Sequence, residues 1–355
     1  MKLKEILLAT LLVPCLLTAC TAEEMPGGNQ QPGGTEQQPV APGETGLFTF
    51  AFDAGTFATV DTRVISNDAA LNEIWVVQLN AAGTAALVPP VQVTSIGSDQ
   101  KIRVKLKAEE SKVYFFANTG KSDLFDPTAA LNTFTTSSVE ATNTSTGLNW
   151  GNKSYIPMFA TWPATGTGTP TTPTISGTTE LTRCLAHVSV TVISETGGNL
   201  AISSIQLRNV PNVLQLCPST ASAYPAATGT YLDYSATTSR TLSYYVAENC
   251  RGTGSGRYET EKTASAVTGG AYATYVEVKG KYKNMIDVTY RFYLGGNATN
   301  DYNVKRNTKY TVTTTIKGMN ETDMRVTIDT PSYSTSSNTD ATWGDGSSEN
   351  VDGTI

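Results

Sequence analysis

Apolar and polar residues alternate along several segments of the chain, which is the pattern of β-strands with one buried face. The clearest segment runs from Leu47 to Asp53, where Phe48, Phe50 and Phe52 fall on the same face. Comparable segments in the first half of the chain predict strands at residues 74–79, 101–106, 113–117 and 155–159. In the second half they predict strands at residues 183–193, 201–207, 242–246, 274–282, 286–294, 310–316 and 324–328.

These strands, with turn-forming residues between them, predict an all-β fold of two tandem Greek-key β-sandwich domains, transthyretin-like or immunoglobulin-like. A length of 355 residues fits two domains of roughly 150 residues each. Residues 164–174 are rich in Gly, Thr and Pro and are expected to link the domains. The predicted domains are residues 47–175 and residues 176–355, the second with a C-terminal tail. Residues 123–136 are expected to contain a short helix.

The start of the chain has the features of a targeting signal rather than of a folded element. Two early lysines are followed by an apolar segment, residues 6–17, that is too short to span a membrane. The segment ends in Leu17-Thr-Ala-Cys20, which resembles a bacterial lipobox. We predict a lipoprotein signal peptide over residues 1–20 and lipidation of Cys20. The alternative is an ordinary secretory signal in which Cys20 is incidental.

Residues 21–46 are mostly Gly, Pro, Gln and Glu and are predicted to form a flexible tether. With acyl chains on Cys20, this tether would hold the folded part at a membrane without a membrane span. The formal net charge is -6 and the sequence pI is about 5.0. This acidic balance argues against a nucleic-acid partner, because such a partner requires a basic face.

Candidate catalytic residues are scarce. The single histidine, His187, and Cys184 fall on opposite faces of the strand predicted at residues 183–193, so they cannot form a nucleophile–base pair. We expect Cys184 in the core and His187 at the surface or between the domains. Gly252–Gly256 lacks the lysine and the helix start of a phosphate-binding loop. We therefore predict no catalytic residue, no cofactor, no metal site and no enzymatic activity.

Two further residue types leave alternatives open. After the lipobox the cysteines are Cys184, Cys217 and Cys250, an odd number that allows a Cys217–Cys250 disulfide without requiring it. Several tyrosines fit either a sugar-binding platform or ordinary strand packing, and strand packing is favoured because tyrosine is common in strands. These tyrosines are Tyr231, Tyr234, Tyr244, Tyr245 and Tyr258.

Motifs in the second half of the chain carry a likeness to a known family. The segment Tyr290-Arg-Phe-Tyr-Leu-Gly295, followed by Tyr302-Asn-Val-Lys-Arg-Asn-Thr-Lys-Tyr310, resembles the most recognisable part of the Bacteroidetes fimbrillins, the subunits of type V pili. Residues 181–190 and 244–249 resemble that family as well, and the likeness extends more weakly into the first half. The part from Val304 to Thr308 is the most specific.

The resemblance implies a function and a route of assembly. Subunits of this family travel as lipoproteins to the outer membrane, where an arginine-specific protease cuts in the loop after the first strand. That strand leaves, and a terminal strand of the next subunit fills the groove, which is donor-strand exchange. The implied partners are other fimbrial subunits, the protease and, before cleavage, the outer membrane. The implied location is the outer membrane and the fimbrium, where the protein serves adhesion.

Particular residues match this route. Arg63 follows the phenylalanine-rich strand and is the only arginine between Cys20 and Arg103, so we predict cleavage there. The displaced strand would carry Phe48, Phe50 and Phe52, whose burial contributes roughly 5–9 kcal/mol at about 1.5–3 kcal/mol each. The donor is expected between residue 324 and the C-terminus. Its apolar positions are Met324, Val326, Ile328 and, further along, Trp343.

Other roles also fit the sequence. The chain could be a tip or an anchor subunit of a fimbria, since an anchor would keep its lipid and first strand and a tip would lack a usable donor tail. It could also be an outer-membrane surface lipoprotein that binds glycans and does not polymerise. These alternatives differ in whether the chain is cut after Arg63 and then forms multimers.

Overall fold

The computed structural model describes residues 38–56, 69–94, 96–120, 138–140, 142–144, 147–149, 155–217, 231–333 and 350–351. The described part consists of strands and three short 3-10 helices, which confirms the all-β fold class. Some predicted features lie outside the described residues: the signal peptide with Cys20, the loop with Arg63, the short helix at 123–136, and Trp343.

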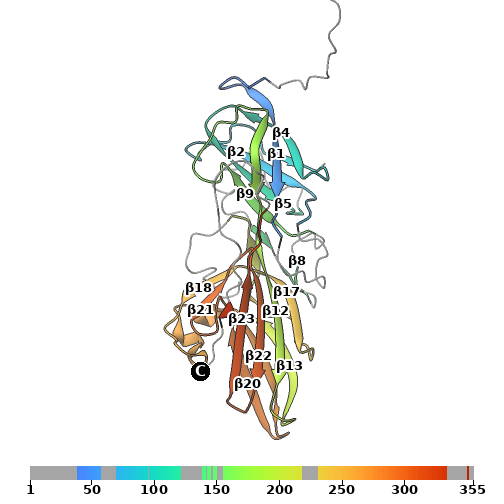
Figure 1. Cartoon of the computed structure of the whole chain (residues 1–355), viewed down its shortest axis with the longest axis vertical. Coiled ribbons are helices and arrows are strands. Elements are labelled where there is room, and N and C mark those ends of the chain that lie inside the picture. The colour runs from blue at the N-terminus through green and yellow to red at the C-terminus, as the bar shows by residue number, and fades with distance from the viewer. Residues whose placement is uncertain are drawn as a thin grey trace, which may run out of the picture. The chain divides into compact units, whose positions relative to one another are not determined.

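Two sheets use strands from the first half of the chain (Figure 1). The smaller has the order β10-β1-β4 and the larger has the order β11-β9-β5-β2-β3. Their bounds are β1 (Thr45–Asp53), β2 (Ile74–Asn80), β3 (Val91–Val93), β4 (Lys101–Lys107), β5 (Ser111–Ala117), β9 (Met158–Trp162), β10 (Thr174–Glu180) and β11 (Thr182–Arg183). The short strands β6 (Ser138–Glu140), β7 (Thr142–Thr144) and β8 (Gly147–Asn149) lie between β5 and β9 in the chain.

The strand prediction for this half is confirmed in its essentials: β1 and β4 alternate with one buried face, whereas β2 is buried on both faces. Ile102, Val104 and Leu106 of β4 are buried while the residues between them are exposed. Gln78 is a buried polar residue of β2, and its side-chain amide donates to Lys107 O and to Ser111 Oγ. Its polar group therefore has partners inside the core, as burial of an amide requires.

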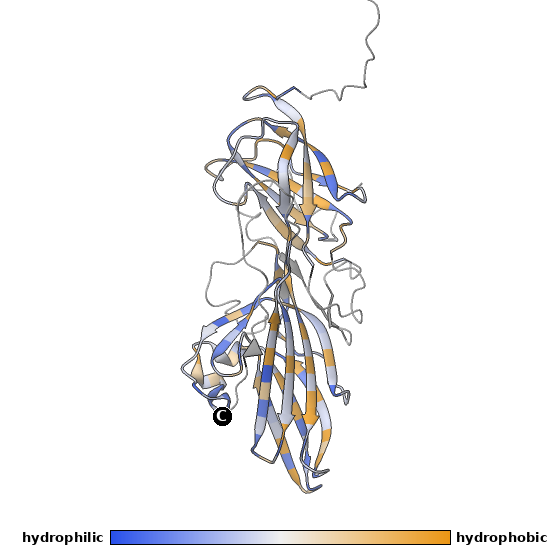
Figure 2. Ribbon diagram, viewed as in Figure 1, coloured by the Kyte–Doolittle hydropathy of each residue, from blue (hydrophilic) through white to orange (hydrophobic). Residues whose placement is uncertain are grey.

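The second half of the chain builds two larger sheets, with the orders β17-β12-β22-β23-β24 and β13-β19-β20. Figure 2 shows apolar and polar residues alternating along these strands. Their bounds are β12 (Leu185–Ser194), β13 (Leu200–Arg208), β17 (Thr241–Ala247), β19 (Tyr275–Tyr282), β20 (Ile286–Tyr293), β22 (Lys309–Ile316), β23 (Thr322–Asp329) and β24 (Asn350–Val351). Smaller elements are β14 (Val210–Pro211), β15 (Val213–Gln215), β16 (Tyr231–Leu232), β18 (Asn249–Thr253), β21 (Asp301–Val304), η1 (Glu259–Glu261), η2 (Ala264–Ala266) and η3 (Gly270–Tyr272).

Strand β12 is central in its sheet, antiparallel to β17 and parallel to β22. Cys184, just before it, is fully buried as expected, and the three described cysteines carry free thiols, so Cys217 and Cys250 do not pair. His187 does not lie at the surface, so that part of its expectation is wrong, whereas a place between the domains stays a prediction. His187 is 5% exposed, its Nε2 lies 2.9 Å from Ser243 Oγ, and its ring packs on Tyr245 at a centroid distance of 4.9 Å.

The division into two domains stays a prediction, but strand pairing refines where it would fall. Residues 164–173 connect β9 to β10, and Gly168 forms a bridge with Ser111. Because β10 pairs with β1 and β11 pairs with β9, the pairing partners change only after Arg183. The predicted tether also ends earlier than Gly46, since the Val40 N–H donates to Thr171 O and its side chain packs against the core.

Candidate functional site

Strand β1 lies in the middle of its three-stranded sheet. It pairs antiparallel with β4 over seven residues and parallel with β10, where the register shifts between Thr49 and Ala51. One edge of β1 therefore hydrogen-bonds to a strand about fifty residues later in the chain, and its other edge to a strand about 125 residues later. Removing β1 would leave the edges of β4 and β10 facing each other across an open groove.

The inner face of β1 supplies three large rings to the core. Phe48 and Phe50 are fully buried and Phe52 is 5% exposed, whereas Leu47 on the other face is 46% exposed. Phe50 and Phe52 both make edge contacts with Phe115 of β5, at centroid distances of 5.0 Å. The predicted burial of this face is thus confirmed, and β1 links the two sheets through aromatic packing.

The residues that leave β1, Ala54 to Thr56, are held by polar contacts from distant parts of the chain. The guanidinium of Arg183, itself 1% exposed, donates to Ala54 O at 2.7 Å and to Gly55 O at 2.9 Å. Thr56 and Ser332 exchange backbone hydrogen bonds of 2.8 Å and 2.9 Å. The exit of β1 is therefore fastened both to β11 and to the segment that follows β23.

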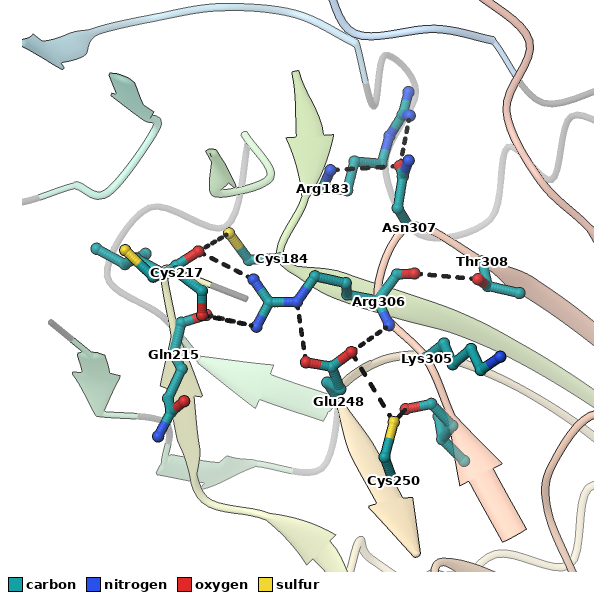
Figure 3. A network of polar contacts seen from close by, with 12 residues as sticks. Arg183, Cys184, Gln215, Cys217, Glu248, Cys250, Lys305, Arg306, Asn307 and Thr308 are labelled. Atoms are coloured by element: carbon teal, nitrogen blue, oxygen red, sulfur yellow. Dashed lines mark hydrogen bonds and ion pairs between the residues drawn. The ribbon is translucent and has the colours of Figure 1, made fainter. Parts of the chain in front are cut away.

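Two further side chains join this group. Asn307 Oδ1 accepts from the Arg183 backbone N–H at 3.3 Å and from its guanidinium at 3.4 Å, contacts visible in Figure 3. The Asn307 amide donates to the Tyr333 hydroxyl at 2.8 Å, and that hydroxyl donates to Leu181 O at 3.3 Å. Asn307 has a φ of +53°, a left-handed conformation in which asparagine is favoured over most other residues.

The neighbouring Arg306 explains the rest of the sequence motif at residues 304–308. Its guanidinium donates to the Glu248 carboxylate at 3.0 Å and to the carbonyls of Gln215, Leu216 and Cys217 (Figure 3). Arg306 is 8% exposed, so this charge is both paired and hydrogen-bonded in the interior. The motif that carries the family likeness is thus a structural junction, and its two polar side chains bind chain segments far away in sequence.

Strand β23, which carries the predicted donor positions, belongs to the core of its own chain. Met324 and Val326 are 1% and 2% exposed, and β23 pairs with β22 along all eight of its residues. The carboxylate of Glu259 accepts the Met324 N–H at 2.8 Å, and burial raises the pKa of that carboxyl. On its other edge β23 pairs with β24 at Val326 and Thr327.

The tyrosines considered as a sugar platform do not form one surface. Tyr234 and Tyr245 are buried, and the Tyr234 hydroxyl donates to Tyr245 O, which favours the strand-packing interpretation for both. Tyr231 stacks on Tyr272 at 5.3 Å, with the Arg251 guanidinium 5.4 Å from the Tyr231 ring centre. Tyr258 alone among the five is half exposed.

The second half also holds two notable charged groups. Glu277 on β19 is 3% exposed and receives Arg208 at 2.8 Å, Lys279 at 3.0 Å and Arg291 at 3.2 Å. Burial alone would raise the pKa of Glu277, but the hydrogen bonds from these cations outweigh it and the pKa is lowered. Burial lowers the pKa of Lys262 to about 7, although its Nζ donates to Asn297 O.

Two features are absent from the described residues. These residues contain no group of three or more His, Cys, Asp or Glu side chains placed to hold a metal ion. They also contain no helix that is both long and apolar enough to cross a membrane.

Comparisons with known proteins agree with this architecture. A family described as "Domain of unknown function (DUF4906)" matches residues 244–314, which include the end of β17, the Arg306 junction and most of β22. No curated protein matches the sequence.

Several solved structures are similar. One is the tip fimbrial protein from Porphyromonas gingivalis with a C-terminal truncation, at a TM-score of 0.54 and 13% identity, covering 80% of this chain and 99% of that one. Another is a fimbrilin from Porphyromonas gingivalis W83, at 0.51 and 14%, covering 80% and 97%. A third is a putative cell adhesion protein from Bacteroides eggerthii, at 0.51 and 17%, covering 82% and 98%.

The class is therefore defined by fold: the structural neighbours of this chain are fimbrial and cell adhesion proteins of the Bacteroidetes, and the chain shares their architecture. The resemblance expected from the motifs is confirmed at that level. The sequence did not reveal the contacts of Arg183 and Tyr333 with the exit of β1. Arg183 stands in a largely apolar strand segment, and this local signal indicates a buried arginine that needs polar partners.

Proposed function

We propose that this chain is a structural subunit of a surface fimbria that serves adhesion. It is exported as a lipoprotein through Cys20, cut after Arg63 by an arginine-specific protease, and joined to the next subunit by donor-strand exchange. Its partners are other fimbrial subunits and the protease. Its location is the outer membrane before cleavage and the fimbrium afterwards, and it has no catalytic role.

The central position of β1 carries this proposal. The strand lies near the N-terminal end of the described chain, before the loop that contains Arg63, so a single cut there would detach it covalently. Its three buried phenylalanines stabilise the sheet by roughly 5–9 kcal/mol, comparable to the whole stability of a typical domain. A cut subunit would therefore lack a stable N-terminal sheet until another strand occupied the groove between β4 and β10.

The arrangement of β23 narrows the choice of donor. To act as donor, β23 would have to break eight paired residues with β22 and withdraw Met324 and Val326 from their own core. We therefore assign the donor to the segment after Asp329, which contains Trp343, rather than to β23 itself. If the subunit gave up this segment, its five-stranded sheet would lose only the two-residue edge strand β24 and would keep β17, β12, β22 and β23.

The test is to treat the purified chain with an arginine-specific protease and to separate the products in SDS without boiling. We expect a new N-terminus at Val64 and a ladder of SDS-resistant multimers. Arg63→Lys, which keeps the charge but removes the protease target, should abolish both. Arg103→Ala, on the exposed face of β4, is the matched control and should leave the ladder unchanged.

The alternatives give different results in the same experiment. A chain that stays monomeric and uncut under all conditions would overturn the proposal and favour a surface lipoprotein that does not polymerise. A chain that is cut but accepts a donor without providing one would be a tip subunit. A chain that keeps β1 but donates its tail to others would be an anchor.

A further inference from the structure

We infer that Arg183, Asn307 and Tyr333 form an exit latch, which holds Ser332–Tyr333 at the start of the C-terminal segment only while β1 is in place. The inference rests on the proposed function for its purpose, because it makes loss of β1 the event that frees the segment after β23. The latch itself is a set of contacts among described residues and can be tested without any cleavage.

The first observation is that one short piece of backbone, Ala54 to Thr56, supplies the partners on the side of β1. Two of its carbonyls accept from the Arg183 guanidinium, and Thr56 makes both of the backbone hydrogen bonds to Ser332. A cut after Arg63 places all three residues on the departing fragment. Ser332 would then lose both of its backbone hydrogen bonds to Thr56 in one event.

The second observation is the close fit between Gly55 and Tyr333. Gly55 has a φ of +62°, and a Cβ added there would lie 2.9 Å from the Tyr333 ring and 3.0 Å from Ser332 O. The ring therefore packs directly on the backbone at the exit of β1, where only glycine leaves enough room. Departure of β1 would remove one wall of the site in which the Tyr333 ring lies.

The third observation concerns the charge at the centre of the latch. Arg183 is 1% exposed, and its guanidinium keeps good hydrogen-bond geometry with Ala54 and Gly55 as long as they are present. A buried guanidinium that loses two acceptors must rearrange or become hydrated, because an unsatisfied buried charge is strongly unfavourable. Asn307, which bonds to both Arg183 and Tyr333, would pass this rearrangement on to the tyrosine hydroxyl.

The latch gives assembly an order. An uncut subunit would keep Ser332 and Tyr333 docked, so these first residues of the C-terminal segment would not be available to a neighbour. Loss of β1 would open the acceptor groove and loosen the start of the C-terminal segment in the same step. Premature association of uncut subunits would thereby be suppressed by contacts within each chain.

The test is hydrogen exchange of the uncut chain, measured at the Ser332 amide by mass spectrometry with fragmentation. Gly55→Ala should push the Tyr333 ring away and speed exchange at Ser332 by about tenfold, because the bond to Thr56 O is lost. Gly43→Ala is the matched control, since Gly43 also has a positive φ (+82°) but has nothing within 4 Å of an added Cβ. This control should leave Ser332 exchange unchanged.

Tyr333→Phe is the second variant, since it removes only the hydroxyl between Asn307 and Leu181. It should speed hydrogen exchange at the Ser332 amide by about threefold, because the hydroxyl contacts with Asn307 and Leu181 are lost. Equal exchange at Ser332 in wild type, Gly55→Ala and Tyr333→Phe would overturn the latch. Because the uncut chain is measured, a protein that is never cut by the protease would refute the proposed function without deciding the latch, and the exchange result would decide it separately.

Discussion

Strands β1 and β23 lie near opposite ends of the described chain, and both bury an alternating apolar face, yet they are placed very differently. β1 is shared between a parallel and an antiparallel neighbour in a sheet of three strands, with an irregular register on one side. β23 pairs regularly with β22 over eight residues in a sheet of five strands. At its end β1 is fastened by the side chain of Arg183, whereas Glu259 fastens β23 near its start.

Burial alone therefore does not distinguish the strand that we propose is exchanged from the strand that we propose stays in place. Both strands would cost several kcal/mol to remove, because each carries fully buried apolar side chains. What distinguishes β1 is that a single break in the following loop separates it from the rest of the chain. Under the proposed function the donor is the segment that follows β23, and β23 itself stays paired with β22.

The largest loss of unfolding free energy is expected for a substitution at the centre of β1. Phe50→Ala should lower the free energy of unfolding of the uncut chain by about 3–5 kcal/mol, because it leaves a cavity against Phe115 and Trp162. Urea unfolding followed by tryptophan fluorescence measures this loss. Leu47→Ala, on the exposed face, should change it by less than about 0.5 kcal/mol. After protease treatment, Phe50→Ala and wild type should unfold alike; a persisting difference would mean that β1 had stayed.

A comparable but somewhat smaller loss of unfolding free energy is expected for a substitution on β23. Met324→Ala should cost about 2–5 kcal/mol, since the methionine is almost fully buried but is more adaptable than a phenylalanine ring. The same loss should be measured before and after protease treatment, because β23 stays in its own sheet. Arg325→Ala, the exposed neighbour, is the control. If Met324→Ala no longer lowered the stability of the chain after cleavage, our assignment of β23 to the subunit's own core would be contradicted.

A smaller change in the free energy of unfolding, which depends on pH, is expected at Glu277 on β19. The three cations around Glu277 lower its pKa in the folded state, so its contribution to stability is present above the ordinary glutamate pKa of about 4.3 and is lost as pH falls through the lowered value. At pH 7 Glu277→Gln should therefore cost about 1–3 kcal/mol.

Denaturant unfolding between pH 7 and pH 3 checks this expectation, and the difference between wild type and Glu277→Gln should shrink toward the acidic end. Asp287→Asn breaks an ion pair with Lys281 whose side chains are 83% and 55% exposed, so it should have almost no effect at any pH. A constant cost of Glu277→Gln across this range would show that the lowered pKa does not contribute to stability.

The smallest difference between the uncut and the cut chain is expected in the alkylation of the buried thiols. Burial raises the pKa of Cys184 to about 11 and that of Cys217 to about 12, so both should resist alkylation at pH 8 in the folded chain. They should stay unreactive after β1 has been removed, because they belong to the core beside β12. Mass spectrometry of iodoacetamide-treated peptides measures each site. Labelling of Cys184 that rises after cleavage would show that loss of β1 loosens the second half of the chain as well.

The sequence by itself determined the class of fold and most of the strands. Alternation with a period of two is a local signal, so the buried faces of β1 and β23 could be predicted from a few consecutive residues. The likeness to fimbrillins came from motifs around Arg306 and Asn307, although their contacts could not be foreseen. His187 shows the limit of the local signal, since it was expected at the surface or between the domains, and its ring is buried against Tyr245.

Only the tertiary structure decided which strands are neighbours. Arg183 and Ala54 are 129 residues apart in the chain, and Thr56 and Ser332 are joined across an even longer interval. No periodic pattern encodes such pairs, because they depend on how two sheets close around a common core and on where the connecting loops end. The same reason explains why the alternation at residues 324–328 predicted a strand and a candidate donor face but not the pairing of β23 with β22 along its whole length.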